Sequence, residues 1–343
     1  MRSHTAAPHR MKMTDDTTRF DPWESTVATF RGLLPLAMIG FSLALAGCAA
    51  GLHASAAYAP QEHVQTVPGF ADFIAVDGPT VWMTNRGRVE HWSLTGKIAQ
   101  VALPHPCGAM AIGYGSLWVA DCHDATLDRI DLKTARLSAR IKTGIANPRG
   151  ETNVVIGNGS VWIASDRTGA ISRIDPESNT VTARIPVDAD TYYLSYGLGA
   201  LWATSPTRRS LEKIDPQTNR VVMRTALGGY PGFLVAGEGA VWIQEQADGT
   251  VVRVNPENGV VTGRVKVETN LKYGDIDAGG GNIWLRTTTG QTFAVIDPQS
   301  LVIRSRVGKP TGSGALRYTS SGLWTTSHDI HTLSLWTPVL PPP

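Results

Sequence analysis

A short motif recurs along the chain, in which a glycine turn is followed by an aliphatic residue, a tryptophan and a polar end. It reads "GYGSLWVADC" at 113–122 and "GNGSVWIASD" at 157–166. Seven tryptophans follow this lattice with spacings of 36, 44, 40, 40, 42 and 40 residues: Trp82, Trp118, Trp162, Trp202, Trp242, Trp284 and Trp324. A period of about forty residues is typical of the four-stranded blades of a β-propeller. The repeat therefore predicts seven blades.

Each repeat has the pattern of four strands separated by turns, with alternating β-branched residues in the strands. In the third repeat the expected strands are 152–157, 160–165, 170–175 and 180–187. Asn158-Gly159 is a tight-turn pair, and the Ile174-Asp175-Pro176 step ends the third strand because proline cannot donate to a strand ladder. No helical periodicity occurs between residues 62 and 337. The expected fold class is all-β.

The two ends of the repeat array complement each other. The last repeat stops after its third strand, 331–336, and a spare strand, 62–67, precedes the first repeat. Pairing these two segments would complete the last blade, close the ring and remove exposed sheet edges. We therefore expect one seven-bladed propeller over residues 62–337, followed by a proline-rich tail at 338–343.

The N-terminus has the features of an export signal. Arg31 precedes the apolar run 32–47, which is too short for a comfortable membrane span. The run ends in "LAGC" at 45–48, which resembles the lipobox of bacterial lipoproteins. This resemblance implies a signal segment over residues 1–47 and lipidation of Cys48.

The segment after Cys48 is expected to be a flexible tether, over residues 48–61. Alanines, not an acidic residue, follow Cys48, and by resemblance to diderm lipoproteins this implies the periplasmic face of the outer membrane. Ordinary signal cleavage within 54–60 is the alternative. In either case the protein is expected in the cell envelope.

Two further cysteines lie in the second repeat. Cys107 and Cys122 are equidistant from the turn centred on Tyr114-Gly115, so they should face each other across the first two strands, within disulfide reach. Export favours a disulfide. His105 and His123 flank these cysteines, so a zinc or copper site is one alternative and free thiols are another.

One face of a propeller gathers the starts of the first strands and the ends of the second strands around the central channel. Several repeats place acids, amides and tyrosines there, where the others place small or apolar residues. The expected channel-mouth binding residues are Asp72, Asn85, Asp121, Glu151, Asn153, Tyr192, Tyr193, Tyr230, Tyr273, Asp275, Asp277 and Arg317. The alternative is that these groups hydrogen-bond one another and channel water.

Three smaller patterns have competing interpretations. Asp275 and Asp277 face the same side of one strand, so they either bind a cation together or pair with Arg317 of the adjacent blade. His328 and His331 lie in the loop after the second strand of the last repeat, where a metal pair is disfavoured because no carboxylate cluster accompanies them. The run Ser327–His328–Asp329 is not expected to be a catalytic triad, because adjacent residues point apart.

The repeats resemble a known family. "GSLWVAD" (115–121) and "GAVWIQE" (239–245), followed in some repeats by "RIDP", are similar to the streptogramin lyase (virginiamycin B lyase) and YVTN-type seven-bladed propellers. In the lyases, glutamate and histidine residues hold Mg²⁺ at the channel mouth, and a cyclic depsipeptide is opened by elimination, which needs a base and a cation. The resemblance implies that Glu245 is catalytic. The family's strand-start histidines are replaced, for example by "PCG" at 106–108.

The net charge and the replaced histidines limit the classes of function that we expect for this chain. Lys and Arg number 31 against 29 Asp and Glu, a net charge of +2, so nothing favours nucleic-acid binding. We expect a monomeric propeller, in contact with the membrane only through its lipid, that binds a peptide, protein or glycan at the channel mouth. A magnesium-dependent lyase is the alternative, and an assembly factor of an envelope machine is a third hypothesis.

Overall fold

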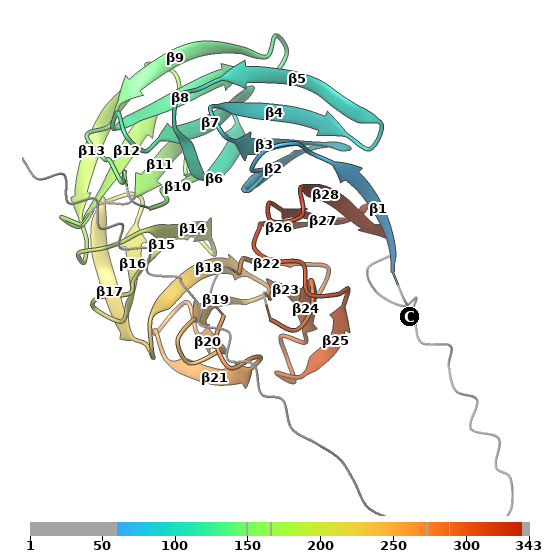
Figure 1. Ribbon diagram of the computed structural model, residues 1–343. Helices are drawn as coiled ribbons and strands as arrows, with labels where there is room; N and C mark the ends of the chain where they lie inside the picture. The colour runs from blue at the N-terminus through green and yellow to red at the C-terminus, as the bar shows by residue number, and fades with distance from the viewer. Residues whose placement is uncertain (1–59, 149, 165–166, 272–273, 288, 338–343) are drawn as a thin grey trace, which may run out of the picture. The chain divides into compact units, whose positions relative to one another are not determined.

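Seven four-stranded antiparallel sheets follow one another along the chain as the blades of a β-propeller (Figure 1). The computed structural model describes residues 60–337 except 149, 165–166, 272–273 and 288. The predicted all-β class is confirmed, since the described residues form strands and turns without a helix. This part of the chain accordingly contains no helix of the length and apolarity needed to cross a membrane. The predicted signal segment, Cys48, most of the tether and the tail lie outside the described residues.

Each blade runs from its innermost to its outermost strand in chain order, except the seventh. Blades 1 to 3 are β2 (Ile74–Asp77), β3 (Thr80–Asn85), β4 (Arg88–Ser93) and β5 (Gly96–Ala102); β6 (Pro106–Gly113), β7 (Ser116–Asp121), β8 (Thr126–Asp131) and β9 (Arg136–Lys142); and β10 (Asn153–Gly157), β11 (Ser160–Ala164), β12 (Ala170–Asp175) and β13 (Thr180–Pro186).

Blades 4 to 7 complete the ring in the same order. They are β14 (Tyr193–Gly197), β15 (Ala200–Ser205), β16 (Ser210–Asp215) and β17 (Arg220–Ala226); β18 (Pro231–Gly237), β19 (Ala240–Glu245), β20 (Thr250–Val254) and β21 (Val261–Lys266); β22 (Ile276–Gly279), β23 (Asn282–Arg286), β24 (Phe293–Ile296) and β25 (Ile303–Val307); and β26 (Leu316–Thr319), β27 (Gly322–Ser327), β28 (Thr332–Thr337) and β1 (Gln61–Thr66).

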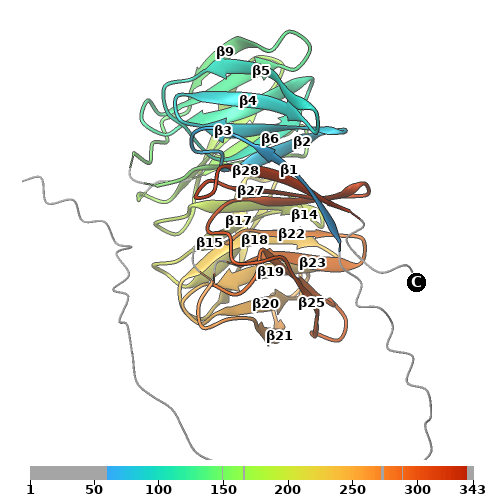
Figure 2. The ribbon, with the colours of Figure 1, turned by 45° about the vertical axis from the view of Figure 1, so that its right-hand side comes forward.

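The ring closes as predicted, through the first strand of the chain. β1 pairs antiparallel with β28 from Gln61 opposite Thr337 to Thr66 opposite Thr332. The two strands lie side by side in both views (Figures 1 and 2). Because β1 supplies the outermost strand of blade 7, the start and the end of the propeller are held in one sheet.

The motif tryptophans are buried at the interfaces between blades, and all seven are among the largest fully buried side chains. In blades 2 to 6 the indole N–H donates to the carbonyl of the glycine five residues earlier, at 2.9–3.1 Å. The glycine turn and the tryptophan are therefore one structural unit, which explains why they recur together.

A cation on the third strand of blades 2 to 5 covers the tryptophan and reaches into the next blade. The cation lies 4.8–6.0 Å from an indole ring. It also donates to the carbonyl of the proline in the neighbouring turn at 2.6–2.8 Å. The pairs are Arg129 with Pro176, Arg173 with Pro216, Lys213 with Pro256, and Arg253 with Pro298. The repeated Asp-Pro or Asn-Pro turn thus accepts the hydrogen bond that joins successive blades.

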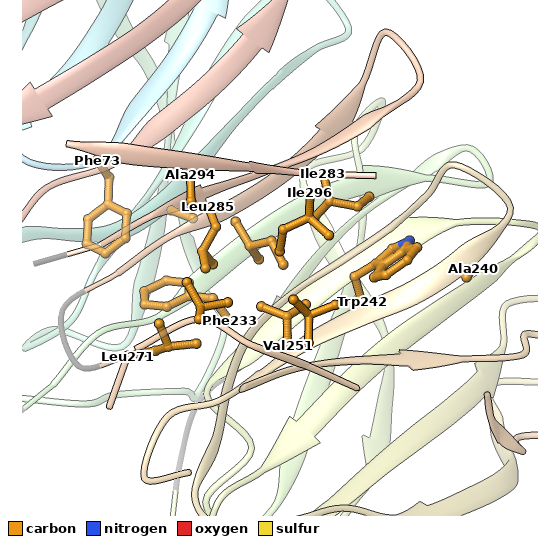
Figure 3. Close-up of a cluster of buried hydrophobic side chains, with 14 residues drawn as sticks. Phe73, Phe233, Ala240, Trp242, Val251, Leu271, Ile283, Leu285, Ala294 and Ile296 are labelled. Carbon is orange, nitrogen blue, oxygen red and sulfur yellow. The ribbon is translucent and has the colours of Figure 1, made fainter. Parts of the chain in front are cut away.

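Aromatic side chains from opposite sides of the ring meet in the channel. Phe73 of blade 1 lies 6.2 Å from Phe233 of blade 5, and Tyr193 of blade 4 lies 4.2 Å from the same Phe233 ring. Phe73 and Phe233 lie at one end of a larger buried cluster that extends to Trp242 (Figure 3).

Candidate binding site at the channel mouth

A cavity of about 670 Å³ opens at the face where the loops before the first strands and after the second strands gather. Its walls come from blades 1, 2, 3 and 7, and Phe73 lies among the lining residues. Phe233, the partner of Phe73, lines a second cavity of about 440 Å³ along the innermost strands. The mouth cavity is therefore backed by the aromatic rings of the channel. Its volume is in the range of small-molecule sites.

Two carboxyl groups in the mouth cavity are protonated more readily than usual. Burial raises the pKa of Asp72 to about 7, and the charge of Asp275 adds to this while that of Arg286 opposes it. Burial, together with the charges of Asp72 and Asp275, raises the pKa of Glu151 to about 8. A hydrogen bond joins Glu151 to the hydroxyl of Tyr193. Near neutral pH these carboxyls can both donate and accept hydrogen bonds.

An aromatic stack forms the rim of the cavity on the side of blades 1 and 7. The Phe70 ring stacks on the His328 imidazole with centroids 3.9 Å apart, and the Arg86 guanidinium lies 5.5 Å from the Phe70 centroid. Burial lowers the pKa of His328, although the Asp329 carboxylate, 2.8 Å away, opposes this. At neutral pH His328 therefore carries a neutral imidazole, able to stack and to accept a proton.

The "PCG" segment at 106–108 has a packing reason for its glycine. Gly108 has φ +70, and a β-carbon there would lie 2.1 Å from the carbonyl oxygen of Thr152 in blade 3. Only glycine allows the backbones of blades 2 and 3 to approach so closely at the mouth. This approach brings Cys107 and Glu151 into the same cavity wall.

The predicted disulfide between Cys107 and Cys122 is present, with Cα atoms 6.0 Å apart. The expected direct pairing is corrected, however, because the β6–β7 register shifts between Cys107 and Ala111 and places Cys107 opposite Ala120. The bond therefore runs diagonally, from β6 to the residue just after β7. Cys107 lines the mouth cavity, so the disulfide supports its wall.

Four of the predicted mouth residues line the second cavity instead: Asn153, Asp275, Asp277 and Arg317. Asp275 forms an ion pair with Arg317 at 2.5 Å and accepts a hydrogen bond from the Leu316 N–H at 3.1 Å. Asp277 accepts one from the Tyr318 N–H at 2.8 Å. Of the two sequence interpretations, the ion pair with the adjacent blade is the one found, and it joins blade 6 to blade 7.

The other predicted residues are distributed around the same face. Asp72, Asn85 and Glu151 line the mouth cavity. The Tyr192 hydroxyl donates to Asp190 at 2.6 Å, and Tyr230 is 50% exposed. Asp121 lies beside His105, on blade 2. Tyr273 lies outside the described residues.

Glu245 has its carboxylate fully engaged within blade 5. It accepts hydrogen bonds from Arg264 at 2.9 and 3.1 Å, from Thr250 at 2.7 Å and from the Gly228 N–H at 2.7 Å. Burial opposes ionisation, but these bonds prevail and lower the pKa of Glu245. Because an arginine already neutralises the carboxylate, Glu245 as placed here does not fit a magnesium ligand. It does not line the mouth cavity. Its hydrogen bonds give it a structural role within blade 5, and the catalytic role implied by the family resemblance stays a prediction.

The sequence analysis did not place five residues at the channel mouth: Phe70, Arg86, His328 and Asp329, which lie in loops, and Arg286, which ends β23. Arg286 is 0% exposed, and its charge acts on both Asp72 and Asp275. Its Nη2 contacts Thr311, Gly312 and Ser327, while Nε and Nη1 have no hydrogen-bond partner. Arg86 and His328 are polar residues that closely follow a motif tryptophan, and this spacing was the signal that could have placed them at the channel mouth.

Comparison with solved structures finds propellers that share this fold. Virginiamycin B lyase from Staphylococcus aureus superposes with a TM-score of 0.71 at 17% identity, over 82% of this chain and 100% of that one. A streptogramin B lyase has a TM-score of 0.68 at 14% identity, over 81% and 97%. The computationally designed protein Ika8 reaches 0.60 at 10% identity, over 79% and 98%. No protein family and no curated protein matches the sequence. At these identities the likeness establishes the fold alone.

Proposed function

We propose that the protein binds a small peptide-like ligand in the mouth cavity. The observation that carries this proposal is the cavity, which places the carboxyls of Asp72 and Glu151 beside the stacked rings of Phe70 and His328. Burial raises the pKa of Asp72 to about 7 and that of Glu151 to about 8, so both carboxyls exchange protons near neutral pH. Protonated carboxyls donate to amide carbonyls, and ionised ones accept from amide N–H groups. The cavity volume suits a small ligand rather than the surface of a globular protein.

The rim supports the same assignment. Phe70 and His328 offer a stacking surface for an aromatic or proline side chain. Arg86 is exposed beside them and can donate to a carbonyl or to a terminal carboxylate. A peptide-like ligand offers backbone amides to the two carboxyls, a ring side chain to the rim and a carbonyl to Arg86.

Ring-opening elimination is a second candidate, favoured by the placement of a neutral His328 in the same cavity as Asp72 and Glu151. The neutral imidazole takes the α-proton of an ester-linked residue, a Cα–Cβ double bond forms as the Cβ–O bond breaks, and a protonated carboxyl gives a proton to the departing carboxylate. The product then has the mass of the substrate. No step is assigned to magnesium, because Glu245 does not fit that ion.

The test uses a B-type streptogramin, a cyclic depsipeptide, as the probe. Its dissociation constant is measured by calorimetry for the unaltered protein and for Phe70→Ala and Arg86→Ala. Loss of the stacking ring should weaken binding about tenfold. The matched control is Tyr114→Ala, an exposed aromatic residue in a turn outside the cavity lining, which should leave the affinity unchanged.

The same samples are then analysed by chromatography with mass detection, with and without a chelator. Binding with intact probe supports the binding proposal, and a new peak of unchanged mass supports elimination. A gain of one water would indicate hydrolysis and contradict both. Absence of binding at about 1 mM, or equal losses in Phe70→Ala and Tyr114→Ala, would contradict a site in the mouth cavity. A chito-oligosaccharide binding where the depsipeptide does not would identify a glycan site instead.

We also propose that the propeller acts in the cell envelope, attached through a lipid on Cys48. The lipobox-like "LAGC" run and its apolar lead-in support this assignment. The ligand would then be one that reaches the periplasmic space. This proposal is independent of the cavity and is tested separately below.

A further inference from the structure

Three potential metal ligands come together on the loops of blade 2. His105 belongs to the loop between β5 and β6, Asp121 ends β7, and Asp124 lies in the loop that follows β7. One ligand atom from each side chain lies within 4.8 Å of the others. His105 Nδ1 is 3.5 Å from Asp121 Oδ1. An imidazole and two carboxylates are therefore gathered from segments that are not adjacent in the chain.

Asp121 supplies an independent sign of a missing ligand. The residue is 1% exposed, and its Oδ2 is buried without a hydrogen-bond partner. Its Oδ1 accepts from the backbone N–H groups of His123 and Asp124, both at 3.1 Å. A buried carboxylate oxygen with no partner is costly, and such atoms are uncommon in folded proteins. A cation at this place would satisfy it.

The surrounding contacts hold the three ligands in place before any ion binds. The His123 imidazole stacks on that of His105, with centroids 4.0 Å apart. The backbone N–H of Cys122 donates to the His105 carbonyl at 3.2 Å, and Cys122 itself is fixed by the disulfide with Cys107. Because both thiols are consumed in that bond, the ligand set is imidazole and carboxylate rather than thiolate.

We propose that His105, Asp121 and Asp124 bind one divalent transition-metal ion of the zinc type. A nitrogen donor with two carboxylates suits Zn²⁺, whereas Mg²⁺ and Ca²⁺ prefer oxygen ligands alone. Three protein ligands leave a coordination position for water or for an external group. The site joins two loops of blade 2 next to Pro106 and Cys107, which line the mouth cavity. Bound metal would thus reinforce that wall, whatever ligand the cavity takes.

The test is a calorimetric titration of Zn²⁺ into the metal-stripped full-length protein, made without a polyhistidine tag or reductant. One equivalent should bind saturably, and the Tm should rise with zinc. His105→Ala and Asp124→Asn should each weaken binding by about tenfold or more. The matched control is His63→Ala, an exposed histidine on β1, which should leave the affinity unchanged.

The side chains of His105 and Asp124 are exposed, so we expect both variants to fold. Thermal melting in the presence of a chelator checks this without a contribution from bound metal. The proposal is overturned by the absence of saturable zinc binding below about 1 mM. It is equally overturned if His105→Ala binds zinc as tightly as the unaltered protein. Binding of Mg²⁺ or Ca²⁺ in preference to Zn²⁺ would also overturn it, because the imidazole would then not be a ligand.

Discussion

Replacing Glu245 by glutamine separates a structural from a catalytic role for this residue. The substitution preserves shape but removes the charge that accepts two hydrogen bonds from Arg264. Hydrogen bonds to a charged group contribute about 1.5–3 kcal/mol each in favourable cases, but the Arg264 side chain is 45% exposed and solvent screens it. We therefore expect a loss of about 2 kcal/mol, which corresponds to a Tm lower by about 4–8 °C.

The pH dependence of this loss provides an internal check. The pKa of Glu245 is lowered in the folded protein, so its contribution is present above the ordinary value of 4.5 and is lost as the pH falls through the folded value. The Tm difference between Glu245→Gln and the unaltered protein should therefore be full near neutral pH and shrink in acid. Scanning calorimetry measures the Tm of the variant and of the unaltered protein at each pH. Glu257→Gln, an exposed turn position, is the control. An unchanged Tm at neutral pH would refute this structural role.

Three further predictions concern other parts of the molecule. The raised pKa values of Asp72 and Glu151 mean that the protonated forms stabilise the fold; this stabilisation is full below their ordinary values and is lost as pH rises through about 7 and 8. As the pH rises from about 5 to about 9, the Tm of Glu151→Gln should therefore fall less than the Tm of the unaltered protein. Parallel curves of Tm against pH for the two proteins would contradict this. Arg173→Ala removes an inter-blade hydrogen bond and an indole contact, so unfolding in urea should be easier by about 1–2 kcal/mol. The exposed Arg136→Ala should change little, and equal effects would argue against the inter-blade role. Cys48→Ala should move the protein from the membrane to the soluble envelope fraction on cell fractionation, and persistence in the membrane would contradict lipid attachment.

The blades could be predicted from the sequence because the repeat consists of one local unit, the glycine turn with its tryptophan. In blades 2 to 6 the motif tryptophan donates a hydrogen bond to a glycine five residues earlier, so the pattern is contained within a short segment and can be read from its spacing. The partner of Arg173, by contrast, is the Pro216 carbonyl of the next blade. That contact depends on the rotation between blades, which no local pattern specifies.

The candidate site was only partly predictable for a similar reason. Asp72 and Glu151 precede first strands and reach the mouth cavity as expected. Asp275 also precedes a first strand, yet it turns into the channel because Arg317 and the Leu316 N–H bind its carboxylate. His328 reaches the cavity through a loop, and its stacking on a ring far away in the sequence has no signature in residue spacing.

The most direct test of a binding site at the mouth is a crystal structure of the propeller soaked with a B-type streptogramin. The account predicts density for the ligand in the mouth cavity, against the Phe70 ring and within hydrogen-bond distance of Glu151. The neighbouring blades should be undisturbed, because the cavity is already formed. Density at any other place, or a cavity that remains filled by water alone at saturating ligand, would contradict the central claim.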